Sequence, residues 1–434
     1  MEASAVQTRT ATRHPRSTSL EPRLDPLLSA PVVSSELDVS RERPLPQIGR
    51  GRCVAVLAVH HVHTGGQILT GGAEKYVCDA IEALLAAGAR VHVGYSGVSV
   101  YGDLLERYGP DRLTVEHVGW VDERLSGDDR FGFGRLRERR RWLRATHADT
   151  LFIIQQASGA AFFTSLIAAR TLGLRVVSSI RQMAPHATEN GRAISWPAAM
   201  LRSSVRRRLL PARCCDAVIF NSARVSQDYL RGFAFPAARA HVILNGHRGG
   251  AAVRRRRSAP PVIGVVGRVS KEKGCDIALE AFARVAGRHR AARLVYIGDG
   301  PLASILEERA AALGIADRVQ FAGYVADRER VYAAMDVCVQ ASRRESMANT
   351  VIEAMARGIP CVVSDVGGLP EAVRDGETGI VFRDGDVEAC AGAIERLLGE
   401  EGVWAAYSSA AAGHARQVFS WERFAGQTAR AVLG

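Results

Sequence analysis

From residue 52 onward, short apolar runs alternate with longer segments in which apolar residues recur at helical spacing. The first run, Cys53–Val59, leads through a glycine-rich stretch into the helical pattern of Glu74–Ala87. Short buried strands separated by helices are typical of a parallel sheet covered on both faces. The pattern therefore predicts one doubly wound domain over residues 52–245. Its further strands are expected at Arg90–Tyr95, Leu113–Val118, Leu151–Ile154, Arg175–Ile180, Ala217–Phe220 and His241–Leu244.

The stretch 246–261 interrupts this pattern, because it contains three glycines, two prolines and four consecutive arginines without any periodicity. Such a composition indicates a linker. The alternation then restarts and predicts a second domain of the same class over 262–415, followed by a closing helix over 416–434. The expected fold class is α/β, with two facing Rossmann-like domains and a ligand site in the cleft between them. Strands of the second domain are expected at Val262–Val266, Leu294–Ile297, Val319–Phe321, Val337–Val339, Cys361–Val363 and Gly379–Phe382.

Residues 1–51 are rich in Ser, Pro, Arg and Glu and show no sustained apolar period, which predicts a disordered extension. This extension lacks the apolar stretch of a secretory signal, and no run approaches the length of a transmembrane helix. We therefore expect a cytoplasmic protein. The eight cysteines include no Cys-x-x-Cys pair, so we expect reduced, buried thiols rather than a zinc site or disulfides.

The formal net charge is +12, and only three of the 57 basic residues are lysines, which leaves 54 arginines. Arginines cluster at 135–144 and 202–213, interleaved with Trp and Leu as in helices that lie on membranes. The segments 137–144 and 202–208 are therefore either contacts for an anionic membrane surface or solvated helix faces. Nucleic acid is not an expected partner, because no recognition module is present. The sequence does not indicate an oligomeric state.

Two of the three lysines, Lys271 and Lys273, lie in the glycine-flanked stretch Gly267–Gly274, directly after a predicted strand. A compact ammonium beside such a strand-to-helix turn is suited to phosphate. Arg268 and Lys273 would place two cations around one diphosphate. The third lysine, Lys75, follows the double glycine Gly71-Gly72.

Two glutamates flank the start of a further predicted helix. Asn349 is expected to be its N-cap, and the free N–H groups near residues 348–350 can face a phosphate. Glu345, in the loop before the helix, can reach a ligand head group. Glu353, inside the helix, can accept hydrogen bonds from a ribose diol. Carboxylates beside phosphate-binding groups fit a ligand that also carries hydroxyl donors, as a sugar does.

These residues resemble the motifs of retaining glycosyltransferases of family 4, which have the GT-B fold. The similarity covers about residues 52–432. In the second domain it consists of Arg268 with Lys273, Gly298–Pro301, Phe321–Val325, Glu345 with Glu353, Gly367–Glu371 and Asp375–Gly379. In the first domain it is thinner and consists of Gly71–Glu74, Phe220–Ser222 and Ile243–Gly246.

The resemblance implies a nucleotide-diphosphate sugar donor, with a UDP-sugar expected, and no metal or other cofactor. Arg268 and Lys273 would hold the diphosphate, Glu345 the sugar hydroxyls and Glu353 the ribose. Val325 would border the base, and Gly71 and Gly72 would let the first domain close onto the phosphates. The backbone that cradles sugar and phosphate would come from Ser346, Met347, Ala348, Asn349 and Thr350.

One departure from the family concerns the position where many members carry a histidine, which here is Arg181. Either Arg181 or His186 could contact the substrates, and His60, His61 and His63 could line the acceptor side. The expected function is retaining transfer to a lipid-linked or cell-envelope glycan, as in lipopolysaccharide or exopolysaccharide synthesis, at the inner membrane face. The alternatives are a sugar-nucleotide epimerase, a phosphorylase, or an inactive protein that binds nucleotide sugars or membranes.

Overall fold

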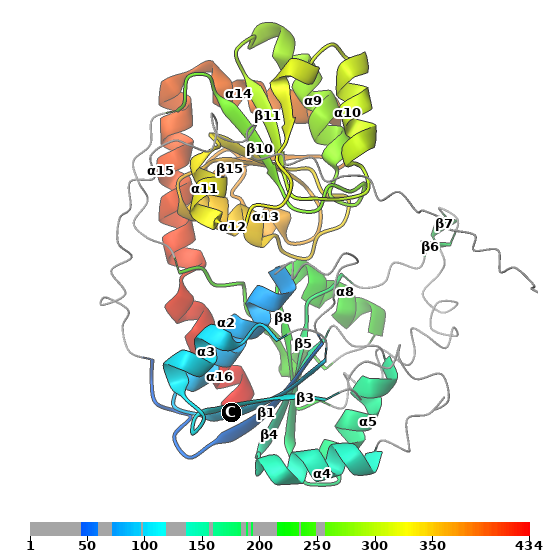
Figure 1. Ribbon diagram of the computed structural model, residues 1–434, viewed down its shortest axis with the longest axis vertical. Coiled ribbons are helices and arrows are strands. Elements are labelled where there is room, and N and C mark those ends of the chain that lie inside the picture. The colour runs from blue at the N-terminus through cyan, green and yellow to red at the C-terminus, as the bar shows by residue number, and fades with distance from the viewer. Residues whose placement is uncertain are drawn as a thin grey trace, which may run out of the picture.

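The computed structural model shows two α/β domains, one above the other in Figure 1. This fold class was predicted from the sequence and is confirmed. The residues that the structure describes are 45–59, 72–96, 99–118, 136–155, 159–183, 188–189, 192–193, 215–233, 236–248 and 257–434.

The N-terminal domain is built on a seven-stranded sheet in the order β3-β2-β1-β4-β5-β8-β9, with every pairing parallel. The strand order reverses between β1 and β4. The strands are β1 (Cys53–Val59), β2 (Arg90–Ser96), β3 (Leu113–His117), β4 (Thr150–Gln155), β5 (Arg175–Ile180), β8 (Ala217–Phe220) and β9 (Ala240–Val242). The helices are α2 (Gly72–Ala86), α3 (Gly102–Tyr108), α4 (Leu136–Thr146), α5 (Gly159–Arg170) and α8 (Ala223–Phe233), with a separate hairpin of β6 (Thr188–Glu189) and β7 (Arg192–Ala193).

The C-terminal domain has a six-stranded parallel sheet in the order β12-β11-β10-β13-β14-β15, which reverses between β10 and β13. The strands are β10 (Val262–Val266), β11 (Arg293–Ile297), β12 (Val319–Phe321), β13 (Val337–Gln340), β14 (Cys361–Ser364) and β15 (Gly379–Phe382). The helices are α9 (Cys275–Arg288), α10 (Ala303–Ala312), α11 (Arg328–Ala333), α12 (Asn349–Ala356), α13 (Leu369–Ala372), α14 (Val387–Gly399) and α15 (Glu401–Val418).

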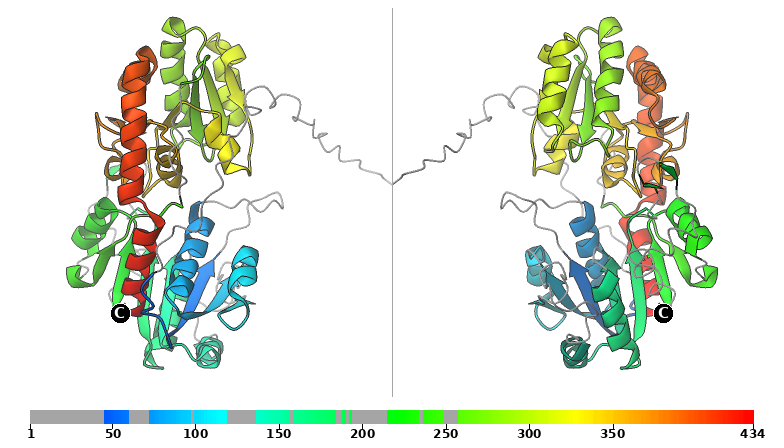
Figure 2. Two further views of the ribbon diagram at one scale, coloured as in Figure 1. Left: turned by 90° about the vertical axis from the view of Figure 1, so that its left-hand side faces the viewer. Right: turned by 90° about the vertical axis from the view of Figure 1, so that its right-hand side faces the viewer.

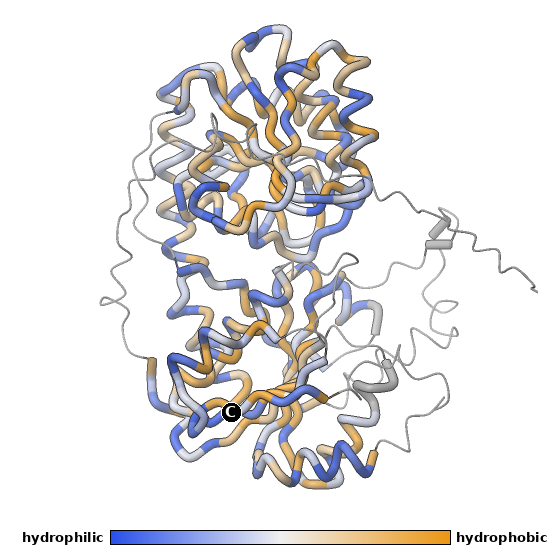
Figure 3. Tube along the Cα trace, viewed as in Figure 1, coloured by the Kyte–Doolittle hydropathy of each residue, from blue (hydrophilic) through white to orange (hydrophobic). Residues whose placement is uncertain are grey.

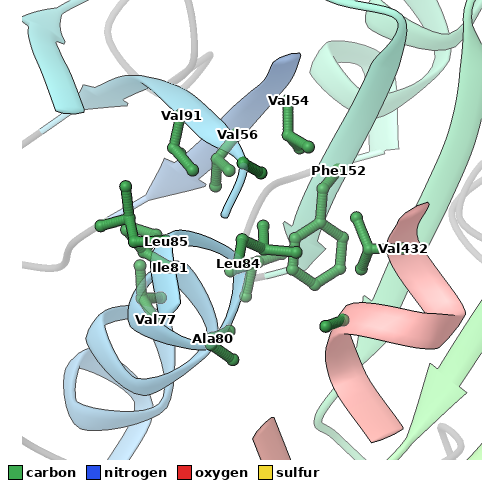
Figure 4. Packing of buried hydrophobic residues seen from close by; sticks show 14 of the residues in the cluster. Val54, Val56, Val77, Ala80, Ile81, Leu84, Leu85, Val91, Phe152 and Val432 are labelled. Carbon is green, nitrogen blue, oxygen red and sulfur yellow. The ribbon is translucent and has the colours of Figure 1, made fainter. Parts of the chain in front are cut away.

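In the core of the N-terminal domain, the apolar residues of α2 form the face that packs against the sheet, as their helical spacing predicted. Leu84 and Leu85 of this helix are buried against Val56 of β1, as Figure 4 shows. The strands of both sheets are largely hydrophobic along their length (Figure 3), as expected for sheets that are covered on both faces. Val432 contributes to the same core from the far end of the chain.

The C-terminal segment returns to the N-terminal domain. The predicted closing helix over 416–434 is in fact the end of α15 and a separate helix, α16 (Trp421–Leu433), with Ser420 accepting from the N–H of Arg423 as its N-cap. Phe424 packs edge-on against Tyr76, with ring centroids 5.8 Å apart. Figure 2 shows α15 along the C-terminal domain and α16 along the N-terminal domain.

The two places where the chain crosses between the domains lie side by side. The N–H of His247 donates to the carbonyl of Phe419 at 2.7 Å. Arg248 lies over the ring of Trp421, 3.5 Å from its centroid, and forms an ion pair with Glu82. The start of the predicted linker over 246–261 is therefore held by specific contacts, whereas residues 249–256 lie outside the described part of the chain.

The sequence predicted that residues 1–51 form a disordered extension, and this prediction is wrong for the last residues of that range, which pack against the N-terminal domain. Gly49 donates to the carbonyl of Ala87 at 2.9 Å, and the side chain of Gln47 donates to the carbonyl of Ala86 at 2.9 Å. Carbonyls at the end of a helix lack partners within the helix, so Gln47 satisfies one of them. This ordering depends on a contact with α2, which the composition of the extension does not reveal. Residues 1–44 lie outside the described part.

The arginine-rich helix α4 also differs from the prediction. Trp142 and Leu143 pack into the domain core, and Arg139 is only 1% exposed and donates to Thr164. The apolar face that resembled a membrane-binding face is therefore used inside the protein. Segment 202–208 lies outside the described residues. Among the helices that the structure describes, none is both long and apolar enough to cross a bilayer.

Candidate active site

The strand-order reversal of the C-terminal sheet brings together the loops that follow β10 and β13. Lys273 lies on the first loop and Glu345 on the second, and Lys273 Nζ donates to Glu345 Oε2 at 2.5 Å. The side chains are 31% and 10% exposed, respectively. In open α/β sheets the reversal point, at the carboxyl ends of the strands, is where ligands bind. An ion pair between two residues singled out in the sequence therefore spans this point.

Close contact between the two loops requires Gly274. This residue has φ +64°, and a Cβ added here would lie 1.7 Å from the carbonyl oxygen of Ala341. Any larger residue would push the loop after β10 away from the loop after β13. Gly274 thus explains how Lys273 can come so close to Glu345.

Arg343 fixes the lysine-bearing turn from the loop after β13. Its guanidinium makes a bidentate pair with Asp276 at 2.6 and 2.8 Å and donates to the carbonyl of Lys271 at 2.8 Å. Burial alone would raise the pKa of Asp276, but the hydrogen bonds and the charge of Arg343, together with hydrogen bonds from the main chain at Asp276 and Ile277, hold that pKa below its usual value. Sequence reasoning missed Arg343. The only available signal was an arginine two positions before Glu345.

The start of α12 differs in detail from the prediction. Ala348 is the N-cap, and Asn349 is the first helical residue. The side chain of Asn349 instead contacts the N-terminal domain, donating to the carbonyl of Gly72 at 3.2 Å and accepting from Asn245. The first N–H groups of α12 still have no partner within the helix. The nucleotide-binding residues predicted here therefore lie where the two domains meet.

The remaining members of the predicted cradle, residues 346–350, are held in place by neighbouring groups. Met347 and Ala348 are buried, and the hydroxyl of Thr350 donates to Gln340 at 3.0 Å. Ser346 Oγ donates to the carbonyl of Arg181 at 2.8 Å and accepts from Asn221 at 3.0 Å. The loop that carries Glu345 is thus attached to the N-terminal domain.

Glu353 is 3% exposed and already has partners on one oxygen. Its Oε2 accepts from Arg328 at 2.6 Å and from the hydroxyl of Tyr332 at 2.9 Å. Its Oε1 is buried without a hydrogen-bond partner among the described residues. The carboxylate therefore keeps one oxygen that can accept hydrogen bonds from the ribose expected at this position. Arg328 and Tyr332 were missed, because only the fold brings them to Glu353.

Comparison with known proteins identifies the family. Residues 260–400 match the family model described as Glycosyl transferases group 1, and residues 70–247 match Glycosyltransferase Family 4. The chain belongs to glycosyltransferase family 4. The resemblance stated from the motifs is thereby confirmed.

Among the similar sequences, Mycobacterium tuberculosis glycogen synthase is 31% identical over 255 residues, which cover 57% of this chain and 61% of the synthase. The α-D-kanosaminyltransferase of Streptomyces kanamyceticus is 30% identical over 260 residues, 56% of this chain and 66% of the relative. The aligned segments therefore span somewhat less than two thirds of these relatives. The similarity places this chain in the family without fixing its donor or acceptor.

Solved structures share the two-domain architecture over most of this family 4 chain. Anabaena HepE in complex with UDP has a TM-score of 0.68 at 20% identity, covering 87% of this chain and 98% of HepE. Staphylococcus aureus TarM has a TM-score of 0.67 at 12% identity, covering 86% and 97%. At these identities the likeness shows the fold alone, and that fold is GT-B.

Arg181, where many family members carry histidine, lies at the junction of the two domains. Its guanidinium is 3.5 Å from the ring centroid of Tyr76 and donates through Nη2 to Asn245 Oδ1 at 2.5 Å. Burial lowers the pKa of Arg181. Nη1 is buried without a hydrogen-bond partner among the described residues.

The other predicted site residues are placed as follows. Arg268 is exposed on the loop that carries Lys273, and Val325 packs beside the core of the C-terminal domain. The structure therefore pairs Lys273 with Glu345, brings Gly72 to Asn349 at the start of α12, and leaves Arg268 at the surface. Gly71, His60, His61, His63 and His186 lie outside the described residues.

Proposed function

We propose that this chain transfers a sugar from a nucleotide-diphosphate donor, a UDP-sugar, to a hydroxyl group of an acceptor, with retention of anomeric configuration. The observation that carries the proposal is the Lys273–Glu345 pair at the reversal point, beside the first turn of α12. HepE, a structural neighbour, has been solved with UDP and with UDP-glucose, which supports the choice of donor.

The hydrogen-bonding capacity of the pair fits such a donor. An ammonium has three donors, and Lys273 uses one of them on Glu345, so the others can meet a diphosphate. Glu345 uses Oε2 in this contact, which leaves Oε1 to accept from a sugar hydroxyl. The N–H groups at the start of α12 provide further donors, and the exposed Arg268 would approach the diphosphate from the side of β10.

In the proposed reaction the acceptor oxygen forms a bond to the anomeric carbon on the face from which the phosphate leaves. The bond between that carbon and the phosphate oxygen breaks, and a donor phosphate oxygen takes the acceptor proton. The products are a glycoside and the nucleoside diphosphate. Lys273 and Arg268 would stabilise the charge that develops on the leaving group, so we propose that no metal is needed.

We propose a lipid-linked or cell-envelope glycan as the acceptor. A lipopolysaccharide core biosynthesis glycosyltransferase of Rhizobium meliloti, LpsE, is 36% identical over 140 residues, which cover 32% of this chain and 40% of LpsE. On α4, Arg137, Arg141 and Arg144 are exposed. Because the apolar side of α4 is buried, we propose that contact with an anionic membrane is made by charge alone.

The test incubates the purified chain with UDP-glucose and other UDP-sugars and a panel of glycan acceptors, and follows UDP release. NMR of the product reports the anomeric configuration. We expect a glycoside with the donor's configuration and loss of transfer in Glu345→Gln. An inverted product would contradict the retaining mechanism, and an epimerised nucleotide sugar without a glycoside would contradict the transferase.

A further inference from the structure

Glu371, on the short helix α13 of the C-terminal domain, caps a helix of the other domain. Its Oε2 accepts from the main-chain N–H of Ala223 at 2.7 Å, and its Oε1 accepts from that of Arg224 at 2.7 Å. These are the first two residues of α8, an eleven-residue helix of the N-terminal domain. A carboxylate at a helix N-terminus gains from the hydrogen bonds and from the helix dipole.

The N-terminal domain itself provides hydrogen-bond acceptors for only some of the N–H groups at the start of α8, and Glu371 provides the others. Ser222 Oγ accepts from the N–H of Val225 at 3.2 Å, which satisfies the third residue of α8 within its own domain. The N–H groups of Ala223 and Arg224 receive their side-chain partner from Glu371. The start of α8 is thus fully capped only when the domains are in the arrangement seen here.

The segment that carries Glu371 also contacts the loop that carries Glu345. Gly367 has φ +56°, and a Cβ added there would lie 1.6 Å from the carbonyl oxygen of Glu345. A Cβ on Gly368 would lie 2.3 Å from the carbonyl oxygen of Ser346 and 2.8 Å from Cβ of Ser222. Gly367–Glu371 therefore lies between the Glu345 loop and the start of α8.

We propose that Glu371 is a positioning residue, which sets the N-terminal domain, and with it the acceptor, relative to the Glu345 loop. The role as a determinant of catalytic geometry rests on the proposed transferase function. Glu371 does not contact the Lys273–Glu345 pair through its side chain. Its loss would move one substrate relative to the other, and a displacement of about 1 Å can lower a rate about 100-fold.

The first test compares Glu371→Ala with Asp386→Ala in the full-length chain. Asp386 also caps a helix, accepting from the N–H of Ala389 at 2.9 Å, but both groups belong to the C-terminal domain. Both variants lose a helix cap, so a general loss of stability affects them alike. We expect kcat to fall at least about tenfold in Glu371→Ala and less than about twofold in Asp386→Ala.

Binding of UDP, measured by calorimetry, separates positioning from loss of the donor site. The contacts between Gly367 and Glu345 lie within the C-terminal domain and remain in Glu371→Ala. We therefore expect the Kd for UDP to change less than about twofold, while Glu371→Gln, which keeps one acceptor oxygen, recovers part of kcat. Equal kcat values for Glu371→Ala and Asp386→Ala, or loss of UDP binding in Glu371→Ala alone, would overturn the proposal.

Amide hydrogen exchange tests the cap without any turnover. Exchange at Ala223 and Arg224 should accelerate in Glu371→Ala, while Val225, capped by Ser222, serves as the internal reference. Unchanged exchange at both amides would refute the interdomain cap. If the wild-type chain neither binds UDP nor transfers sugar, the proposed function fails, whereas accelerated exchange in Glu371→Ala would still establish Glu371 as the residue that joins α8 to the C-terminal domain.

Discussion

The side chain of Arg181 is stacked on Tyr76 and held there by Asn245, which in turn donates to Asn349 at the start of α12. The residue that replaces the family's usual histidine is thus part of a chain of contacts between the domains. Its carbonyl accepts from Ser346 in the same region. These contacts favour a role in domain arrangement over direct contact with the sugar.

Arg181→Lys tests this role. Lysine keeps the charge but lacks the planar group that stacks on Tyr76 and reaches Asn245. We expect kcat to fall about tenfold and the free energy of unfolding to fall by about 2 kcal/mol, the size of a desolvated cation–π contact. Tyr76→Phe keeps the ring for stacking but loses the hydroxyl, which contacts both Ser179 and Arg181, so kcat should fall less than in Arg181→Lys. Full activity in Arg181→Lys would exclude a role for the stacked guanidinium.

Lys273→Ala should lower kcat by about 100-fold or more, because a charge that stabilises the leaving diphosphate is removed. The matched control is Lys271→Ala, two positions earlier on the same loop, where the lysine is exposed. Steady-state kinetics with a UDP-sugar give both values. If the two variants lose activity to the same extent, Lys273 does not stabilise the leaving diphosphate.

The pH dependence of stability should report His247. Burial lowers the pKa of His247 to about 3, and the charges of Lys75, Arg357 and Arg328 act in the same direction. The folded chain therefore keeps His247 neutral, while in the unfolded chain the imidazole binds a proton below its ordinary pKa of 6.5. Stability is fully present above that value and falls as the pH decreases towards 3.

The measurement is urea unfolding of the wild type and His247→Gln at pH 7.5 and pH 5. We expect the wild type to lose at most about 2 kcal/mol more than the variant, since a full proton corresponds to about 1.4 kcal/mol per pH unit. The pKa values of His92, His241 and His414 are lowered as well, but these residues remain in both proteins. Parallel losses in the two proteins would show that His247 titrates normally.

Arg328→Ala should weaken UDP binding about tenfold, because Glu353 would lose the ion pair that orients its carboxylate. Tyr332→Phe leaves that ion pair and should cost about threefold. Arg330, exposed on the same helix, provides the control Arg330→Ala. Calorimetry with UDP measures all three, and unchanged affinity in Arg328→Ala would separate Arg328 from the nucleotide site.

The exposed arginines of α4 predict binding to anionic membranes. Replacing Arg137, Arg141 and Arg144 by Gln should lower the affinity for phosphatidylglycerol vesicles by about 100-fold, because each charge contributes about 1 kcal/mol. Sedimentation of the protein with the vesicles measures this affinity. The control replaces Arg284, Arg288 and Arg309, exposed on the C-terminal domain. Equal losses in both triple variants would indicate attraction by net charge alone.

Most strands of the two sheets could be predicted from the sequence because they are buried on both faces and read as continuous apolar runs, whereas β3, β9 and β12 are partly exposed. Cys53–Val59, Arg175–Ile180 and Val262–Val266 have the predicted bounds. The pairing of Lys273 with Glu345 follows from strand order, since the loops after β10 and β13 meet at the reversal point. A local pattern is sufficient for the bounds of the strands, but the meeting of the two loops depends on the strand order of the folded sheet.

The remaining features depend on contacts between distant segments. Asparagine is a residue type that often forms an N-cap, but the side chain of Asn349 is hydrogen-bonded to Asn245 and Gly72. Ala348 is therefore the N-cap of α12. The apolar residues of α4 indicated a membrane face because a helix pattern does not reveal what covers it. Glu371 appeared only as part of a motif, and its partner on α8 lies 148 positions earlier in the chain.

The position of α16 has a consequence for the order of events during synthesis. Trp421, Phe424 and Val432 belong to the core of the first domain, although they are translated after the entire second domain. Domains usually fold in the order in which they emerge from the ribosome. Here the first domain lacks part of its core until residues 421–433 have been made, so the second domain can reach its native structure earlier than the first.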